Sequence, residues 1–200
     1  AGGMGGWIAL IRVAACAVAA AVALKRDVAY RQRVEGWNSI LGMDITGDTL
    51  DLRHPTGASC SVKKHGAHVC SWNPAGESEV MYMSDMAKFG ENDAIRGGIP
   101  ICFPQFGPRG DLPQHGFMRK SNDWVLSSQF TSKAGDMVLT FKHTDTEATR
   151  GSAWPHPFEC EYEVRLNQET LTTKLRVRNT GEGDFTFTCA LHTYFRVGEA

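Results

Sequence analysis

The stretch between residues 95 and 119, IRGGIPICFPQFGPRGDLPQHGFMR, combines turn-forming Gly and Pro with polar side chains that could bind a ligand. The polar groups of interest are Arg96, Gln114, His115 and Arg119. A loop of this length is usually either functional or disordered, and a disordered linker would lack the Ile and Phe residues that this one contains. We therefore expect an ordered loop that packs against a core and holds these polar groups at fixed positions.

A second candidate for chemistry lies near the end of the chain, in the alternating run DFTFTCALHTYF at 184–195. A period of two puts Phe185 and Phe187 on one face and His192 on the other, polar face, at the end of the predicted strand. Because imidazole titrates near pH 6.5, a positioned histidine can donate a proton. The alternative is a structural histidine whose ring is only packed and hydrogen-bonded.

Composition limits the classes of partner. The chain has 200 residues and a formal net charge of −1, with 42% hydrophobic and 22% charged residues. These values are ordinary for a soluble domain. Near-neutral charge lacks the electrostatic footprint of nucleic-acid binding, so we expect no nucleic-acid partner.

Six cysteines, at positions 16, 60, 70, 102, 160 and 189, form no CxxC pair and no zinc-ligand spacing. We expect no metal site, and we expect buried, small apolar side chains in a reducing compartment. A disulfide between two of them is the alternative.

The N-terminal run Trp7–Leu24 is Ala-rich and contains one charge, Arg12, before a basic stretch. As a helix rising ~1.5 Å per residue it would span about 27 Å, close to a bilayer core. This predicts a membrane anchor, with membrane-protein partners, and a membrane-associated protein in a reducing compartment such as a plastid. Alternatives are a helix packed on another protein, a remnant of a targeting sequence, and a cytoplasmic location.

Most of the remaining chain alternates with a period of two. In ECEYEVRL at 159–166 one face holds Cys160, Tyr162, Val164 and Leu166. TLTTKLRVRN at 170–179 alternates in the same way, and turn residues separate such runs. This pattern is typical of half-buried antiparallel strands. We predict an all-β fold, an antiparallel β-sandwich, with no long helix after the first thirty-odd residues.

Five motifs, in this order, resemble those of the hexose-6-phosphate mutarotases, also called glucose-6-phosphate 1-epimerases, of the aldose-1-epimerase superfamily: AIRGGIPICFPQFG, LPQHGFMR, WPHPFE, LRVRNTG and ALHTYFRVG. The resemblance runs from about residues 36–40 to the last residue. It implies two parts. Residues 1–35 would be a hydrophobic helix with a basic linker, and residues 36–200 the N-terminal portion of a galactose-mutarotase-like β-sandwich.

The resemblance implies interconversion of the α and β anomers of a hexose 6-phosphate, without a metal or organic cofactor. An acid protonates the ring oxygen, a base takes the proton of the anomeric hydroxyl, and the ring opens and recloses on the other face. His192 matches the acid, Gln114 a substrate-binding glutamine, and His115, less closely, a second active-site histidine. Arg96 and Arg119 match arginines that contact the substrate, chiefly its phosphate, and guanidinium groups suit that dianion. The alternative is that both arginines only pair with carboxylates.

The resemblance stops short of the family's general base, a glutamate from a later strand. No residue here matches it, and Glu199 lies in a different motif. We therefore expect the base and the remaining strands to lie beyond residue 200, and residues 1–200 alone to be inactive. The alternative function is a catalytically inactive epimerase-like module, acting as a structural or carbohydrate-binding subunit of a membrane complex.

Overall fold

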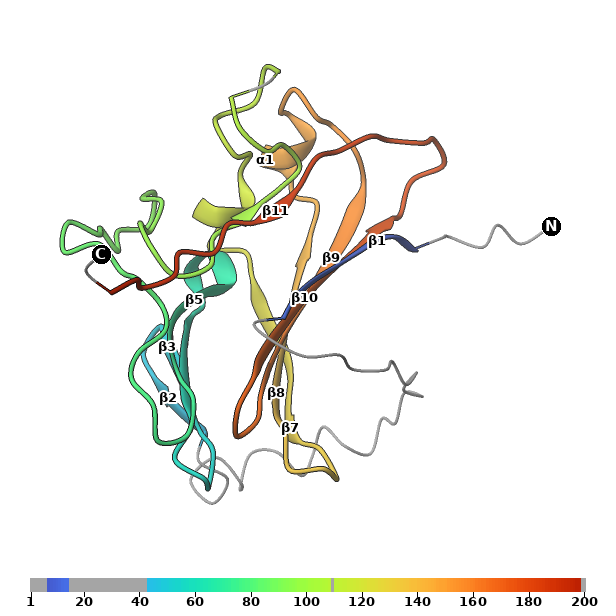
Figure 1. The fold of residues 1–200 in the computed structure, drawn as a ribbon. Helices are drawn as coiled ribbons and strands as arrows, with labels where there is room; N and C mark the ends of the chain where they lie inside the picture. Colours follow the sequence, from blue (N-terminus) through green and yellow to red (C-terminus); the bar gives the residue numbers. More distant parts are fainter. Residues whose placement is uncertain (1–6, 15–42, 109, 199–200) are drawn as a thin grey trace.

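The computed structural model describes residues 7–14, 43–108 and 110–198, and for 7–14 and 44 it describes the backbone only. Regular structure in these residues is mostly antiparallel strand, in one sheet of order β1-β10-β9-β8-β7, one of order β2-β3-β4-β5, and a small pair β11-β6 (Figure 1). The strands are β1 Trp7–Ala14, β2 Met43–Thr46, β3 Thr49–Arg53, β4 Ser59–Lys63, β5 His68–Asn73, β6 Ile101–Cys102, β7 Val125–Thr131, β8 Met137–Thr144, β9 Phe158–Leu166, β10 Leu171–Asn179 and β11 Ala190–Leu191.

Helical structure in the described ranges is limited to single turns. These are the 3-10 turns η2 His65–Ala67 and η3 Met118–Lys120, and the four-residue helix α1 Glu147–Arg150. The prediction that no long helix follows the first thirty-odd residues is therefore confirmed for the part of the chain described. None of these helices is long and apolar enough to cross a membrane.

The two larger sheets enclose one hydrophobic core, as the predicted β-sandwich requires (Figure 1). Burial alternates along β9 and β10, so every second side chain faces this core. The inward residues on β9 include Cys160, Tyr162, Val164 and Leu166, the face predicted from the sequence. Their partners across the core include Cys60 on β4 and Trp72 on β5.

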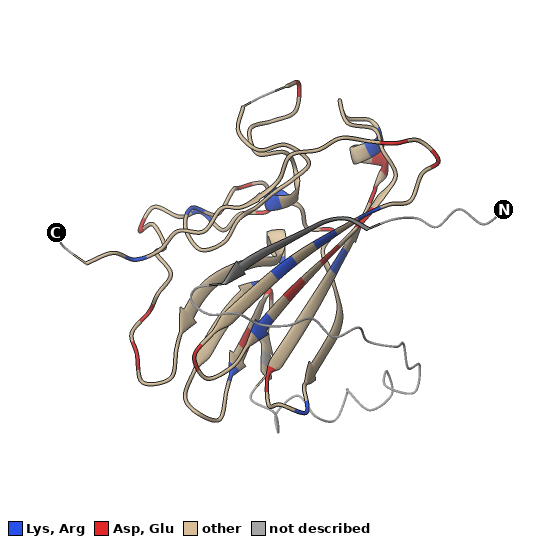
Figure 2. Cartoon of the chain, turned by 45° about the vertical axis from the view of Figure 1, so that its right-hand side comes forward, with Lys and Arg blue, Asp and Glu red and all other residues tan. Residues whose placement is uncertain are grey.

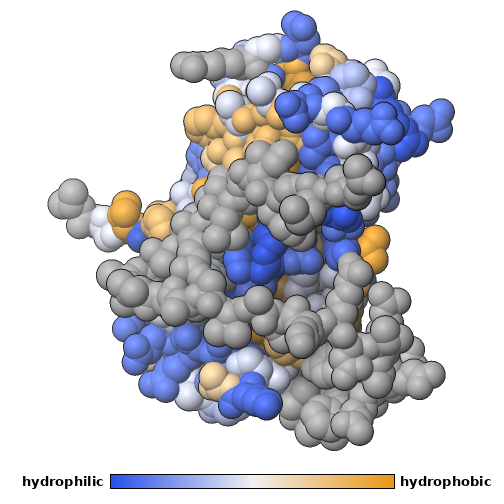
Figure 3. All heavy atoms as spheres, turned by 90° about the vertical axis from the view of Figure 1, so that its right-hand side faces the viewer, coloured by the Kyte–Doolittle hydropathy of each residue, from blue (hydrophilic) through white to orange (hydrophobic). Residues whose placement is uncertain are grey.

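On β9 and β10, the outer face of the five-stranded sheet carries charged residues that alternate with the core residues (Figure 2). Arg176 on β10 pairs with Glu161 and Glu163 on β9, and Arg178 lies 3.1 Å from Glu159. Figure 3 looks onto this side, where hydrophilic side chains are visible between the grey atoms. Such partly exposed pairs add little to stability each, but along β9 and β10 the charges disfavour burial of this face and so fix which face packs on the core.

The helix predicted over Trp7–Leu24 is wrong in its described part. Trp7–Ala14 is strand β1, and it pairs antiparallel with β10. The run contains the β-branched residues Ile8, Ile11 and Val13, which favour a strand, and apolar content alone does not separate a short strand from a helix. Pairing also satisfies backbone groups at the β10 edge. The anchor and its membrane partners thus gain no support, and the division after residue 35 stays a prediction because residues 15–42 lie outside those described.

The predicted strand at 184–192 forms a ladder only at Ala190–Leu191, against β6. The alternation itself is correct, since Phe185 is buried while Thr186 and Thr188 are exposed. The backbone groups before Ala190 instead bond to irregular structure: Thr188 N–H donates to Pro104 O at 2.9 Å, and Thr186 O accepts from the Trp154 indole at 2.8 Å. These partners replace a neighbouring strand.

The cysteines that the structure describes are all free thiols, three of them buried. Burial raises the pKa of Cys102 to about 11 and of Cys70 to about 12, and it raises the pKa of Cys160 well above the usual 9.0. Cys16 lies outside the described residues. The prediction of buried thiols is therefore confirmed for Cys60, Cys102 and Cys160, whereas Cys70 and Cys189 are partly buried, and no disulfide joins the five described positions.

Candidate active site

The described residues of the loop 95–119 pack against the core, as predicted from the loop's apolar residues. Its central Phe103 has no exposed surface, and its ring lies 5.4 Å from that of Trp154 and 5.1 Å from that of Phe187. A parallel bridge joins Phe103 to Gly116 farther along the same loop. The bridge joins the two arms of the loop, one with Arg96 and one with His115 and Arg119, and the ring contacts of Phe103 anchor the loop on the core.

Two glycines let the Arg96 arm approach β5 closely. Gly97 and Gly98 have φ of +115° and +58°, and a Cβ on Gly98 would lie 2.1 Å from the Val69 carbonyl oxygen. A side chain at this position would therefore displace the backbone. The buried His68 at the start of β5 fixes the arm, because its Nε2 donates to Gly97 O at 2.9 Å.

His115 is held by a reciprocal pair of hydrogen bonds with Gly107. The His115 N–H donates to Gly107 O at 3.1 Å, and the Gly107 N–H donates to His115 Nδ1 at 3.1 Å. His115 has φ of +69°, unusual for a residue with a side chain. Residues in sparsely populated conformations cluster at functional sites, and here the pair with Gly107 supports the conformation.

His192 follows β11 and is anchored through its backbone, since its N–H donates to Pro100 O at 3.0 Å. Its half-buried ring is surrounded by other rings. Tyr194 stacks on it at 4.8 Å between centroids, His115 meets it edge-on at 5.5 Å, and Phe106 lies at 6.1 Å. The two histidines that the sequence singled out, 77 positions apart by their numbers, are thus neighbours.

Arg119 adds a positive charge beside these rings. It lies in η3, and its Nη2 donates to Gln114 O at 2.8 Å. Partial burial lowers the pKa of His115 from 6.5, and the charges of Arg119 and His192 lower it further. The described structure therefore brings together Gln114, His115, Arg119 and His192.

No hydrogen bond or ring contact in the described structure links Arg96 to this cluster. Its side chain is exposed and makes no hydrogen bond or ion pair with the residues described. Both arms of the loop nevertheless contact the same turn, at 65–68. On the Arg96 arm, Gly97 O accepts a hydrogen bond from His68 Nε2. On the other arm, Arg119 O lies so close to Gly66 that a Cβ there would be 2.8 Å from it. Neither arginine pairs with a carboxylate anywhere in the described ranges, which disfavours the purely structural alternative.

Sequence reasoning missed two residues of this cluster, Phe106 and Tyr194. Phe106 is one of the apolar residues of the loop, and its ring lies 5.3 Å from that of His115 and 6.1 Å from that of His192. Its exposed fraction of 45% is high for a phenylalanine. The adjacency of Tyr194 to His192 in HTYF was the available signal, because positions two apart on an extended chain share a face.

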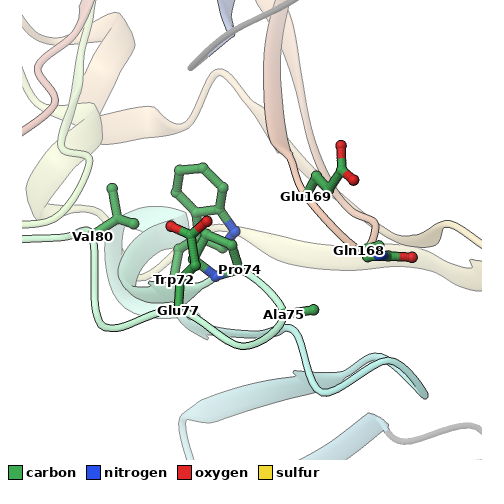
Figure 4. A pocket seen from close by; sticks show the side chains of 7 residues that line it. All are labelled: Trp72, Pro74, Ala75, Glu77, Val80, Gln168 and Glu169. Carbon is green, nitrogen blue, oxygen red and sulfur yellow. The ribbon is translucent and has the colours of Figure 1, made fainter.

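A cavity of about 290 Å³ lies between the end of β5 and the β9–β10 turn. Figure 4 shows Trp72 and Val80 on one side of it and Gln168 and Glu169 on the other. None of the five site residues predicted from the sequence lines it. The candidate active site is therefore an open surface of loops and not this cavity.

Comparison with known proteins agrees with the resemblance read from the motifs. Residues 48–200 match the family described as aldose 1-epimerase. A "Putative glucose-6-phosphate 1-epimerase" from Escherichia coli (strain K12) is 42% identical over 163 residues, covering 76% of this chain and 50% of that protein. A protein of the same name from Cenchrus ciliaris is 34% identical over 159 residues, covering 74% and 46%. The chain thus spans about half the length of the curated relatives it matches.

Solved structures give the same family. The crystal structure of a "putative mutarotase (YeaD)" from Salmonella typhimurium is similar with a TM-score of 0.68 and 36% identity, over 78% of this chain and 51% of that one. A galactose mutarotase-like protein from Clostridium acetobutylicum, 14% identical, shares the fold with a TM-score of 0.54 over 68% and 48%. The predicted galactose-mutarotase-like sandwich is thereby confirmed, and the chain belongs to the aldose 1-epimerase family.

Proposed function

We propose that this chain supplies the acid and the substrate-binding side of a hexose 6-phosphate mutarotase, which interconverts the α and β anomers of its substrate. The observation that supports this is the grouping of His192, His115, Gln114 and Arg119 from two distant segments on one loop surface. A purely structural domain has no physical need for two adjacent histidines beside an arginine without a described carboxylate partner.

In this proposal His192 protonates the ring oxygen of the sugar while the anomeric hydroxyl loses its proton. Its ring is half-buried and stacked on Tyr194, which restricts its orientation, and general acid catalysis requires such positioning. The ring then opens, rotates about C1–C2 and closes on the other face, and His192 regains its proton. The family resemblance implies a glutamate base downstream, and we assign that role to no residue here.

The 6-phosphate is bound by Arg119, with Arg96 as a second contact. Arg119 already fixes the Gln114 carbonyl through one N–H, and forked guanidinium donors can still reach a phosphate oxygen. Arg96 is exposed at the neighbouring arm, free of carboxylates in the described structure, so its long side chain can turn toward the same anion. The loop backbone positions both because the arms share the turn at 65–68.

The rate of anomer equilibration of glucose 6-phosphate, followed by polarimetry or NMR at low buffer concentration, tests this. We expect residues 1–200 alone to be hardly faster than buffer. A chimera in which the second half of the Escherichia coli relative follows residue 200 should accelerate the reaction, with that second half alone as the blank. His192→Asn in the chimera should remove most of the acceleration, since general acids contribute typically ~10²–10⁴-fold.

Two outcomes would overturn the proposal. Strong catalysis by residues 1–200 alone would mean that the base has been misplaced. A folded chimera that binds glucose 6-phosphate without accelerating its mutarotation would favour the alternative, an epimerase-like module that binds carbohydrate or serves a structural role.

A further inference from the structure

The two histidines of the site have different surroundings. The ring of His115 uses Nδ1 as an acceptor, because the Gly107 N–H points at it from 3.1 Å. The same two residues are joined a second time, from His115 N–H to Gly107 O. The ring of His192 makes ring contacts with Tyr194, His115 and Phe106, and its fixed hydrogen bond is made by its backbone.

The Gly107 contact dictates where the His115 proton sits. A neutral imidazole has one protonated and one unprotonated nitrogen. Since a backbone N–H can only donate, Nδ1 must be unprotonated, and the proton must be on Nε2. A doubly protonated ring would oppose its Nδ1–H to the Gly107 N–H, and that hydrogen bond would be lost.

The charges around His115 act in the same direction. Arg119 approaches from η3 and His192 from the segment after β11, and both lower the pKa of His115 beyond the effect of partial burial. No carboxylate of the described residues contributes to this shift. Phe106, which packs on the ring from the loop, is uncharged.

This tautomer also fixes the orientation of Gln114. Its amide nitrogen lies 3.4 Å from His115 Nε2, and two N–H groups cannot bond to each other. The amide oxygen must therefore occupy this place, which needs only a half-turn of the terminal amide, whose nitrogen and oxygen are similar in size. Gln114 is then the acceptor for Nε2–H, and its NH₂ group is available to another acceptor.

We propose that His115 is a neutral hydrogen-bond donor, held as the Nε2–H form by the Gly107 N–H, and that it keeps its proton instead of transferring it. The role toward a sugar rests on the proposed function. When a sugar binds, one of its oxygens replaces the Gln114 amide oxygen as the acceptor of the His115 Nε2–H.

Long-range ¹H–¹⁵N NMR of the 200-residue chain, labelled with ¹⁵N-histidine, tests the tautomer without any substrate. His115→Asn removes the signals to be assigned. We expect the wild-type chain at pH 7 to show an unprotonated Nδ1 and a protonated Nε2 for His115, with a titration midpoint below 6.5. A protonated Nδ1, or a midpoint at or above 6.5, would overturn the proposal. Inactivity of the chimera would not alter this result, so the two proposals fail separately.

Two variants separate the roles of the ring nitrogens. In His115→Asn the side-chain oxygen can replace Nδ1 as acceptor for Gly107 but offers nothing at the Nε2 position. In His115→Gln the amide reaches the Nε2 position but leaves Gly107 without its acceptor. We expect the Gly107 amide to exchange with solvent about two- to twelvefold faster in the Gln variant, the range that a lost neutral hydrogen bond gives, and at the wild-type rate in the Asn variant. Equal exchange in both would contradict the assignment.

Discussion

Acidification should destabilise this fold through one buried histidine that supports the Arg96 arm. His68 has no exposed surface, and its Nε2 donates to Gly97 O. Its Nδ1 is buried and has no partner within the described structure. Charging the ring would put a second proton on Nδ1 without an acceptor, and burial accordingly lowers the pKa of His68 from 6.5 to about 4.

The sign and size of the effect follow from proton linkage. Between pH 6.5 and 4 the unfolded chain binds a proton at this position that the folded chain rejects, so the free energy of unfolding falls as the pH falls. With pKa values of 6.5 unfolded and about 4 folded, the loss at pH 5 is about 2 kcal/mol. Above pH 6.5 both states are neutral and the effect vanishes, and below pH 4 it stops growing.

Urea unfolding at pH 7 and pH 5, followed by circular dichroism, measures this in the wild-type chain and in His68→Gln. The wild-type chain should lose about 2 kcal/mol more than the variant between the two pH values, because contributions from other titrating groups cancel in the difference. His54→Gln, outside the core, should behave like the wild type. The same pH dependence in the wild type and in His68→Gln would refute the reasoning.

Three further predictions concern binding, catalysis and the core. Arg119→Ala should weaken binding of glucose 6-phosphate about 10- to 140-fold, the range for a charge-assisted hydrogen bond, and weaken glucose binding much less, because glucose lacks the phosphate and is affected only through the lost contact with Gln114. Calorimetric titration should show no such loss for Arg150→Ala, an equal charge change at a residue paired with Asp145. His192→Asn should leave glucose 6-phosphate affinity of the chimera within about threefold while reducing its turnover, as expected of a group that acts in the transition state; a matching loss of affinity would indicate a binding role instead. Phe103→Ala should lower the free energy of unfolding by about 3–5 kcal/mol, because its ring fills the centre of the aromatic cluster; a loss below about 1 kcal/mol in urea titration would show that the loop is not anchored there.

Much of the sandwich follows from local pattern. Strands such as β9 and β10 are buried on one face, so their period of two is visible in the sequence and identifies Tyr162 and Val164 as core residues. The same alternation predicts that Phe185 is buried and Thr186 exposed, as the structure shows. These predictions succeed because the sheet face that a side chain occupies depends only on its parity along the chain.

The structural features that the sequence does not reveal depend on contacts with residues that are distant in the chain. Trp7–Ala14 is a strand because β10 offers an edge more than 150 positions away, which no local pattern encodes. The residues before Ala190 lack a ladder because their backbone bonds to Pro104 and Trp154 instead. The contact of Gly107 with His115 Nδ1 depends on loop conformation, and the position of Arg96 relative to the histidines stays a prediction.

The free thiols can report local unfolding of the chain, because they lie in different sheets. Cys60 lies in the four-stranded sheet, Cys160 in the five-stranded sheet, and Cys102 in the small pair beside the site. Only the thiolate reacts with alkylating reagents, so these buried thiols with raised pKa values become reactive when their own segment opens. Pulsed alkylation at increasing urea, read position by position by mass spectrometry, would therefore give the order in which the two sheets and the site-bearing pair separate, with no engineered cysteine or other substitution.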